Sequence, residues 1–235
     1  MRASYILAAG KQSRFKSETP KGLMPWKDGK TVLDINIENS LMFTDKVVIV
    51  TSYENFDIYN DYVNTHYKGD SHIEVVKNKD NFGSGSTIYQ ALVLDYERVF
   101  IMWADSVQED IGLFKACVES MTDTMVIPCR YEENPYTLIE TDDDLRVLRC
   151  RFKKFKEIEN ESGYHDLSLF YGNPIYINFM LHVLSFSNDL KESHGNEMEF
   201  LDIANVSEDI HVIPYETEGV YSFNTVEEFN KISNC

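Results

Sequence analysis

A glycine and two basic residues near the start of the chain have the types and spacing of a phosphate site. Gly10 follows an apolar run, and Arg14 and Lys21 come soon after it. Such a turn presents backbone N–H groups to phosphate oxygens, while a guanidinium can bind two oxygens and an ammonium acts as a movable charge. The residues predicted to contact a nucleoside triphosphate here are Leu7, Ala8, Ala9, Gly10, Lys11, Gln12, Ser13, Arg14 and Lys21.

A carboxylate follows a second apolar run in the middle of the chain. Val99 to Trp103 is typical of a buried strand, and Ala104 and Asp105 come directly after it. Ligands of open parallel sheets bind beyond the carboxyl ends of the strands, and Mg²⁺ prefers one or two carboxylates together with phosphate oxygens and waters. An aspartate after a strand is often only a turn or cap residue. Together with the phosphate turn, Asp105 is better interpreted as a Mg²⁺ ligand, with Ala104 beside the nucleotide.

A glycine- and serine-rich turn lies between a predicted strand and a predicted helix. Glycines allow the backbone to approach a planar base, and the hydroxyls can cap the helix. An ordinary capped helix explains the spacing equally well. The residues assigned here to the nucleotide are Asn81, Gly83, Ser84, Gly85, Ser86 and Thr87.

The first of these segments resembles the nucleotidyltransferase superfamily, which includes sugar-phosphate uridylyl-, thymidylyl- and cytidylyltransferases. Leu7-Ala8-Ala9-Gly10, Ser13-Arg14 and Pro20-Lys21-Gly22-Leu23 are similar to its signature L-A-A-G-x-G-x-R…P-K-x-L. The resemblance implies that Arg14 and Lys21 are catalytic residues on the triphosphate, with Lys21 stabilising the reacting phosphoryl group. Gln12 departs from the signature, which has its second glycine there.

The resemblance also covers the base and metal segments. The family's base-reading turn corresponds to the glycine- and serine-rich turn, and its metal aspartate at the end of a strand corresponds to Asp105. Near the end, Asn224-Thr225-Val226-Glu227-Glu228-Phe229 is similar to the family's N-T-x-E-D/E-Φ segment, which implies that Asn224 is a second Mg²⁺ ligand. Thr225 and Glu228 also have capping-box spacing.

The acceptor side carries a weaker signal. Glu197 begins a segment that is similar to the family's acidic-aromatic helix, and Tyr136 and Asn173 lie where acceptor loops are expected. The family's sugar-binding glutamate has no clear counterpart. A basic run occurs instead, either as a binding site for an anionic acceptor or as a solvated hairpin face: Arg146, Arg149, Arg151, Lys153, Lys154 and Lys156.

The resemblance implies transfer of a nucleoside monophosphate from a nucleoside triphosphate to a phosphorylated small-molecule acceptor, with Mg²⁺ and release of pyrophosphate. The compact chain is most similar to cytidylyltransferases for phosphocholine, phosphoglutamine or similar phosphates, which favours CTP and a precursor of capsule or cell-surface polysaccharide. UTP or dTTP with a sugar 1-phosphate is the alternative. A catalytically silent nucleotide-binding module is a second class, and the incomplete glycine pattern disfavours a Rossmann-type cofactor enzyme.

These residues need a parallel sheet to bring them together. Short β-branched runs alternate with helical stretches as far as Pro128, which predicts an α/β, Rossmann-like, doubly wound, mostly parallel sheet. Strands at 136–140, 145–152, 167–177 and 210–214 and helices at 179–184, 197–204 and 226–232 predict a mixed acceptor half. We expect one domain over 1–235, with a nucleotide-binding half at about 1–130 and an acceptor-binding half at about 131–235.

The composition limits the classes of molecule that the protein is expected to bind. A net charge of −17 opposes binding to nucleic acid, because that needs a basic surface. No apolar run is long enough to span a membrane, and the cysteines form neither a C-x-x-C pair nor a disulfide framework. We expect a soluble cytoplasmic protein whose histidines are structural or on the surface. A homodimer is compatible with the sequence.

Overall fold

The computed structural model describes the chain except for residues 11–14, 16, 80–81, 121, 188–193 and 234–235. Strands and helices alternate along the first half, as the sequence predicts. In order, these elements are β1 (Arg2–Ala8), α1 (Val32–Leu41), β2 (Lys46–Thr51), α2 (Phe56–His66), β3 (Ile73–Lys77), α3 (Ser84–Ala91), β4 (Arg98–Trp103), β5 (Ser106–Gln108) and α4 (Ile111–Glu119). The short 3-10 helix η1 (Lys21–Leu23) lies between β1 and α1.

The second half adds strands and helices of mixed direction. They are β6 (Met125–Glu133), β7 (Thr137–Thr141), β8 (Val147–Phe152), η2 (Lys153–Phe155), β9 (Ser162–Asp166), β10 (Leu169–Gly172), α5 (Pro174–Ser185), η3 (Phe200–Asn205), β11 (Ile210–Pro214), β12 (Val220–Ser222) and α7 (Val226–Ser233). The turn predicted at Thr141 to Asp144 connects the antiparallel strands β7 and β8.

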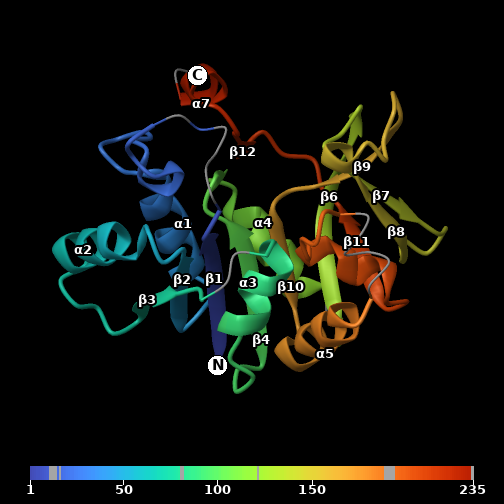
Figure 1. Cartoon of the computed structure of the whole chain (residues 1–235), viewed down its shortest axis with the longest axis horizontal. Coiled ribbons are helices and arrows are strands. Elements are labelled where there is room, and N and C mark those ends of the chain that lie inside the picture. The colour runs from blue at the N-terminus through green and yellow to red at the C-terminus, as the bar shows by residue number, and fades with distance from the viewer. Residues whose placement is uncertain (11–14, 16, 80–81, 121, 188–193, 234–235) are drawn as a thin grey trace.

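Ten strands of the described residues form one sheet that runs through both halves of the chain. Its order is β3-β2-β1-β4-β10-β6-β9-β7-β8, with β11 paired to β6. The first four strands are parallel, so their carboxyl ends share the upper edge in Figure 1. Because β10 pairs antiparallel with β4, its first residues lie at that same edge. The predicted α/β fold with a large, mostly parallel sheet is confirmed.

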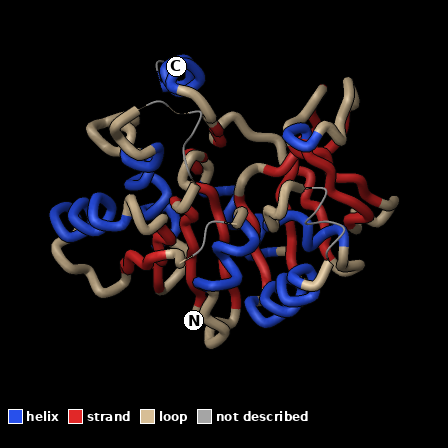
Figure 2. Tube along the Cα trace, in the orientation of Figure 1, coloured by secondary structure: helices blue, strands red, loops and turns tan. Residues whose placement is uncertain are grey.

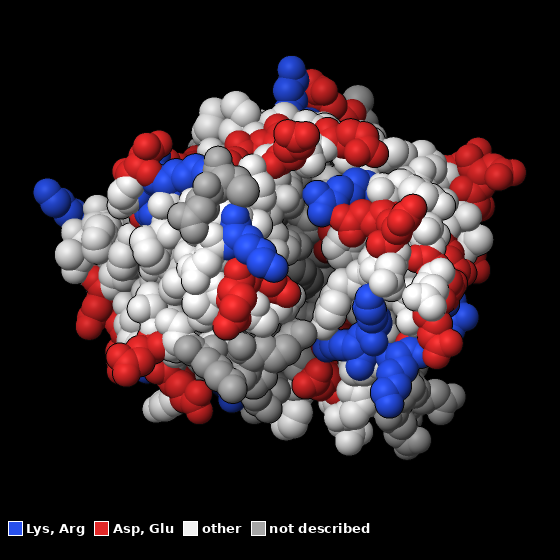
Figure 3. All heavy atoms as spheres, turned by 90° about the horizontal axis from the view of Figure 1, so that it is seen from above, with Lys and Arg blue, Asp and Glu red and all other residues white. Residues whose placement is uncertain are grey.

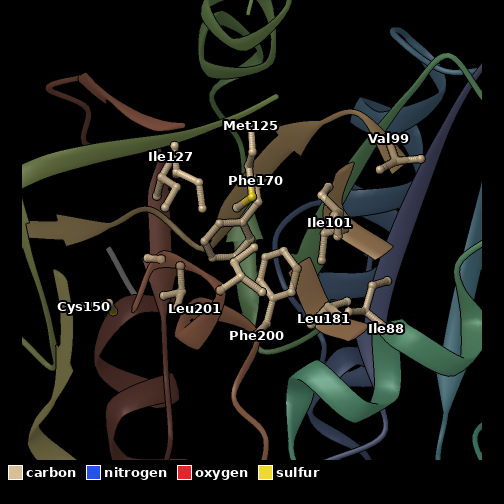
Figure 4. Close-up of a cluster of buried hydrophobic side chains, with 14 of the residues drawn as sticks. Ile88, Val99, Ile101, Met125, Ile127, Cys150, Phe170, Leu181, Phe200 and Leu201 are labelled. Atoms are coloured by element: carbon tan, nitrogen blue, oxygen red, sulfur yellow. The ribbon is translucent and has the colours of Figure 1, made fainter. Parts of the chain in front are cut away.

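Alternate residues of β1 enter two cores on opposite faces of the sheet. Figure 2 shows the helices packed around the strands. Tyr5 and Leu7 belong to the core covered by α3, α5 and η3, whereas Ile6 and Ala8 belong to the core covered by α1, α2 and α4. In Figure 4, Phe170 of β10 and Phe200 of η3 meet in the first of these cores. The near-continuous apolar sequence of β1 follows from this burial on both faces.

A third, smaller core fixes the end of the chain to the start. Phe223 and Phe229 pack against each other and against Phe15 and Trp26, and the Trp26 indole N–H donates to Glu109 at 2.5 Å. This packing holds the segment between β12 and α7 beside η1. Lys21 and Asn224, two predicted site residues from opposite ends of the chain, are therefore anchored by one hydrophobic cluster.

Two predicted elements were wrong in type or extent. The strand expected over 167–177 ends at Gly172, because Asn173 caps α5 through its side-chain oxygen and Pro174 occupies the first helical position. Asn before Pro is a strong helix start. The helix expected over 197–204 is a 3-10 helix that begins at Phe200.

No helix among the described residues is long and apolar enough to cross a membrane.

Candidate functional site

A cleft of about 460 Å³ lies at the carboxyl edge of the parallel strands. Figure 3 looks onto this edge and shows the surface hollowed near the middle, with acidic and basic side chains at the rim. Most of the site residues predicted from the sequence that the structure describes line this cleft. They are Leu7, Ala8, Ala9, Gly10, Lys21, Gly83, Ser84, Thr87, Ala104, Asp105, Tyr136, Glu197 and Asn224.

Lys21 and Asp105 meet directly in the cleft although they are far apart in the sequence. The Lys21 ammonium lies 2.8 Å from Asp105 Oδ2 and 3.4 Å from the backbone oxygen of Phe223. The Lys21 side chain is 12% exposed and that of Asp105 34% exposed, so the pair faces the cleft from a partly dehydrated wall. Charges in such a setting interact more strongly than on an open surface.

The turn that carries Lys21 rests on a buried tyrosine of α2. The Tyr59 hydroxyl hydrogen-bonds to the backbone of Gly22, and burial raises the pKa of Tyr59 well above its usual value. A Cβ on Gly22 would lie 2.8 Å from that hydroxyl oxygen. Glycine at position 22 therefore lets the turn approach Tyr59 closely, and this contact fixes the height of Lys21 above the sheet.

Asn224 reaches the same cleft through a small two-stranded sheet. β12 pairs with β5 and places Ser222 opposite Ser106. The backbone N–H of Phe223 donates to the backbone carbonyl oxygen of Asp105 at 3.2 Å. Asn224 is the next residue and lines the cleft. The Glu228 carboxylate accepts the backbone N–H of Thr225 at 3.2 Å, which is the capping interaction predicted from the spacing of these two residues. It also accepts the backbone N–H of Asn224 at 2.6 Å.

The glycine- and serine-rich turn contacts protein backbone more closely than expected. A Cβ on Gly83 would lie 2.5 Å from the Met198 carbonyl oxygen, and one on Gly85 would lie 2.8 Å from it. Ser84 does not cap α3: its hydroxyl donates to Glu199 and accepts the backbone N–H of Phe200, both at 2.9 Å. Both glycines are thus explained by the close approach of the 198–200 segment.

Gly83→Ala is expected to destabilise the fold by about 2–4 kcal/mol, since the backbone has φ +95° there and the new methyl would overlap a carbonyl oxygen. Gly69→Ala is the matched control, because Gly69 has φ +76° with nothing near its Cβ position. It should lose only about 1 kcal/mol. Urea denaturation of both variants measures the difference, and equal losses would contradict the close-approach explanation.

The wall of the cleft formed by the second half of the chain is built around Lys154. Its ammonium lies 3.2 Å from Glu197 and also pairs with Glu199, and all three side chains line the cleft. Burial lowers the pKa of Lys154, but the two carboxylates outweigh this and raise it. Two other residues of the basic run are paired with different acids: Arg151 binds Glu140 and Glu161, and Arg146 binds Asp142.

Three predicted site residues do not line the cleft. Asn173 caps α5 next to Gly172, which pairs with Val99 at the amino end of β4, so it lies at the edge opposite Asp105 and its acceptor role is wrong. Gly85 is buried against Met198, and the Ser86 hydroxyl accepts the Gln90 side chain. The predictions for Lys11, Gln12, Ser13, Arg14 and Asn81 lie outside the described residues.

Several cleft residues were missed from the sequence. His165 and Asp166 end β9 and line both the cleft and an adjoining pocket of about 300 Å³. The rule that sites gather at strand ends would have found them, had β9 been predicted. Phe152 and Glu199 also face the cleft, as does Lys154 of the predicted basic run, whereas Tyr59 lies within a helix and left no sequence signal.

The donor set fits a hard divalent cation. Asp105 offers a carboxylate and Asn224 an amide oxygen, and Mg²⁺ typically completes its shell with waters and phosphate oxygens. Among the described residues no group of three His, Cys, Asp or Glu side chains could hold a metal by itself. A cation bound between Asp105 and Asn224 would therefore take further ligands from a substrate bound to the protein.

Two solved structures share this fold over nearly the whole chain. The CTP:phosphocholine cytidylyltransferase LicC of Streptococcus pneumoniae superposes with a TM-score of 0.73 and 17% identity, covering 99% of this chain and 98% of that one. HddC of Yersinia pseudotuberculosis, complexed with GMP-PN, gives a TM-score of 0.75 at 16% identity, over 100% and 99%. Identities this low establish the fold alone.

Sequence comparison gives the family. A family model described as the MobA-like NTP transferase domain matches residues 4–172, so the chain belongs to this family within the nucleotidyltransferases. The molybdenum cofactor cytidylyltransferase of Escherichia coli (strain K12) is 29% identical over 125 residues, 52% of this chain. The match spans 61% of that relative's length. The superfamily expected from the opening turn is confirmed.

Proposed function

We propose that this protein transfers a nucleoside monophosphate from a nucleoside triphosphate, with CTP preferred, to a phosphorylated small molecule and releases pyrophosphate. The observation that carries the proposal is the contact of Lys21 with Asp105 in a cleft that Asn224 also lines. The family and the two cytidylyltransferases among the similar proteins support the same chemistry and the choice of CTP.

In the proposed reaction, a phosphate oxygen of the acceptor attacks the α-phosphorus of the triphosphate in line. The new P–O bond forms as the bond to the β-phosphate bridging oxygen breaks, and that oxygen leaves with pyrophosphate. Such transfers depend mainly on positioning and on neutralising charge. The backbone of 7–10 and the turn at Gly83 support the nucleotide, and the Lys21 ammonium, held by Asp105, offsets phosphate charge.

Asp105 and Asn224 are the residues that would hold Mg²⁺. When bound, the ion would supply charge neutralisation to the phosphate oxygens. Arg14 is assigned to the triphosphate beside Lys21, from the signature in the sequence. The acceptor is assigned to the wall formed by Tyr136, Lys154 and Glu197, with a nucleotide half at about 1–130 and an acceptor half at about 131–235.

A nucleotide panel tests the proposal. With Mg²⁺ present, CTP at about one hundred times its Kd should stabilise the protein by about 2.7 kcal/mol, more than ATP, GTP, UTP or dTTP at equal concentration. Pyrophosphate release is then measured with CTP and phosphocholine, phosphoethanolamine or hexose 1-phosphates. Stabilisation without turnover on any acceptor would favour a silent nucleotide-binding module. If turnover is faster with UTP or dTTP and a sugar 1-phosphate, that nucleotide is the donor instead of CTP.

A further inference from the structure

His194 is a buried histidine behind the acceptor side of the cleft. Its side chain is 1% exposed, and its ring stacks on Phe155 with the centroids 3.9 Å apart and 7° between the planes. The Phe152 ring packs edge-on against it at 5.5 Å. These contacts fix the orientation of the imidazole, so both ring nitrogens have fixed partners.

Each ring nitrogen of His194 faces a carboxylate. Nδ1 lies 3.0 Å from Asp202 Oδ2, and Nε2 lies 3.4 Å from Glu157 Oε1. A neutral imidazole donates from only one nitrogen, whereas an imidazolium donates from both. Two ionised carboxylates with a neutral ring would leave two acceptors facing each other in a buried site. The arrangement therefore requires one extra proton, shared by the three groups as a unit.

The groups around this triad act on that proton in opposite directions: burial of Asp202 and the charge of Glu199 favour it, whereas the Glu199 backbone N–H and the Lys154 ammonium oppose it. Burial raises the pKa of Asp202, although His194 acts against the rise. Glu199 adds negative charge nearby and donates its backbone N–H to Asp202 Oδ2 at 3.3 Å. The Lys154 ammonium lies 4.5 Å over Phe155, the ring on which His194 stacks. Burial also raises the pKa of Cys150 well above its usual value, so this thiol stays neutral.

The triad joins two segments that carry the acceptor wall. Glu157 follows η2, which contains Lys154, and Asp202 belongs to η3, which follows Glu197 and Glu199. On the cleft side, Lys154 pairs with both glutamates. The two segments are thus held together by Lys154 in front and by His194 behind.

We propose that His194 is a positioning residue whose shared proton sets the spacing between η2 and η3, and so places Lys154, Glu197 and Glu199 along the cleft. The assignment of this wall to the acceptor rests on the proposed function, but the spacing itself does not. Loss of the proton leaves Glu157 and Asp202 repelling each other across a neutral ring. Burial raises the pKa of Asp202, and a group with a raised pKa in the folded state loses its stabilising contribution as the pH rises through that pKa, so the wall should loosen as the pH rises.

Trp103 offers a direct readout of η3. Its ring packs edge-on against Phe200 at 6.0 Å, and the chain has one other tryptophan, Trp26. In a Trp26→Phe background, the emission maximum of Trp103 is expected to shift as the pH is raised, at a pH above the usual range of an aspartate, because burial raises the pKa of Asp202. His194→Gln keeps a hydrogen-bonding side chain that does not titrate, so it should abolish the shift. An unchanged pH response in His194→Gln would overturn the proposal.

Glu157→Gln provides a second variant if His194→Gln folds poorly. Removing one carboxylate weakens the hold on the shared proton, so the midpoint should move to lower pH by about one unit or more. A midpoint that stays in place contradicts the triad. His72→Gln is the matched control, because His72 is an exposed histidine 2.8 Å from Asp70. Its response should equal that of the background protein.

Stabilisation of the protein by CTP with Mg²⁺ tests the proposed function independently of the inference about His194. If CTP fails to stabilise the unsubstituted protein, the proposed function is weakened, while the fluorescence response still tests His194. If phosphocholine or another acceptor in the panel is turned over, His194→Gln should raise its KM about tenfold or more, because small displacements of positioning groups are costly. The KM for CTP should change less.

Discussion

Asp105→Asn is expected to lower the rate of pyrophosphate release by about 10²–10³-fold. The rate is measured at saturating CTP and Mg²⁺, with saturating phosphocholine or whichever other phosphate the protein accepts. The substitution keeps the size of the side chain but removes the carboxylate charge that lies 2.8 Å from the Lys21 ammonium in the cleft that Asn224 also lines. The fold should persist, because the Asp105 side chain is 34% exposed and its backbone bond to Phe223 is retained.

The metal assignment makes this prediction sharper. If Asp105 binds Mg²⁺, the variant should need a higher Mg²⁺ concentration for half-maximal rate, as well as turning over more slowly. Asp123→Asn is the control, since Asp123 lies on the surface 3.5 Å from Arg98 and away from the cleft. A variant of Asp105 that matches Asp123→Asn in both rate and Mg²⁺ dependence would remove Asp105 from the site.

Lys21→Met is expected to reduce turnover by a similar factor, about 10²–10³-fold. Methionine retains most of the length and apolar volume of lysine, so the packing over Phe15 is largely preserved. What disappears is the ammonium that contacts Asp105 in the cleft and that we propose offsets phosphate charge. The loss should appear mainly in kcat if Lys21 acts on the reacting phosphoryl group, and mainly in KM if it only binds the nucleotide.

Lys115→Met is the control for removing a lysine charge, because Lys115 is exposed on α4 and paired only loosely, at 3.7 Å, with Glu119. The double variant Lys21→Met, Asp105→Asn adds a test of the contact itself. Groups that touch and act together lose less in combination than the sum of their separate losses. Strictly additive losses in activation free energy would show that the two residues act independently.

The parallel half of the fold could be predicted because its pattern is local. The apolar runs of β1, β2 and β4 are buried on both faces, and each is followed by a helix or a turn. Once the strands are parallel, their carboxyl ends must share one edge, so Lys21 and Asp105 were expected to converge. Strand β10 was predicted less well, because the helix start at Asn173 and Pro174 was read as part of the strand.

The wall formed by Lys154, Glu197 and Glu199 could not be predicted because its contacts join distant segments. Nothing in the local sequence indicates that Lys154 would pair with Glu197 and Glu199, or that His194 would lie between Asp202 and Glu157. The glycines at 83 and 85 illustrate the same difficulty. Their sequence suggested room for a base, whereas the structure shows the backbone of Met198 packed against them.

The sequence by itself determined the class of fold and the opening turn, because periodicity, β-branched runs and a short signature act over neighbouring residues. It also placed a carboxylate at a strand end and an asparagine before the last helix. Only the tertiary structure decided that β12 pairs with β5 and brings Asn224 beside Asp105, and that Arg146, Arg151 and Lys154 of the basic run pair with nearby acids. Pairing between segments far apart in the chain depends on packing of the whole sheet, which no local pattern encodes.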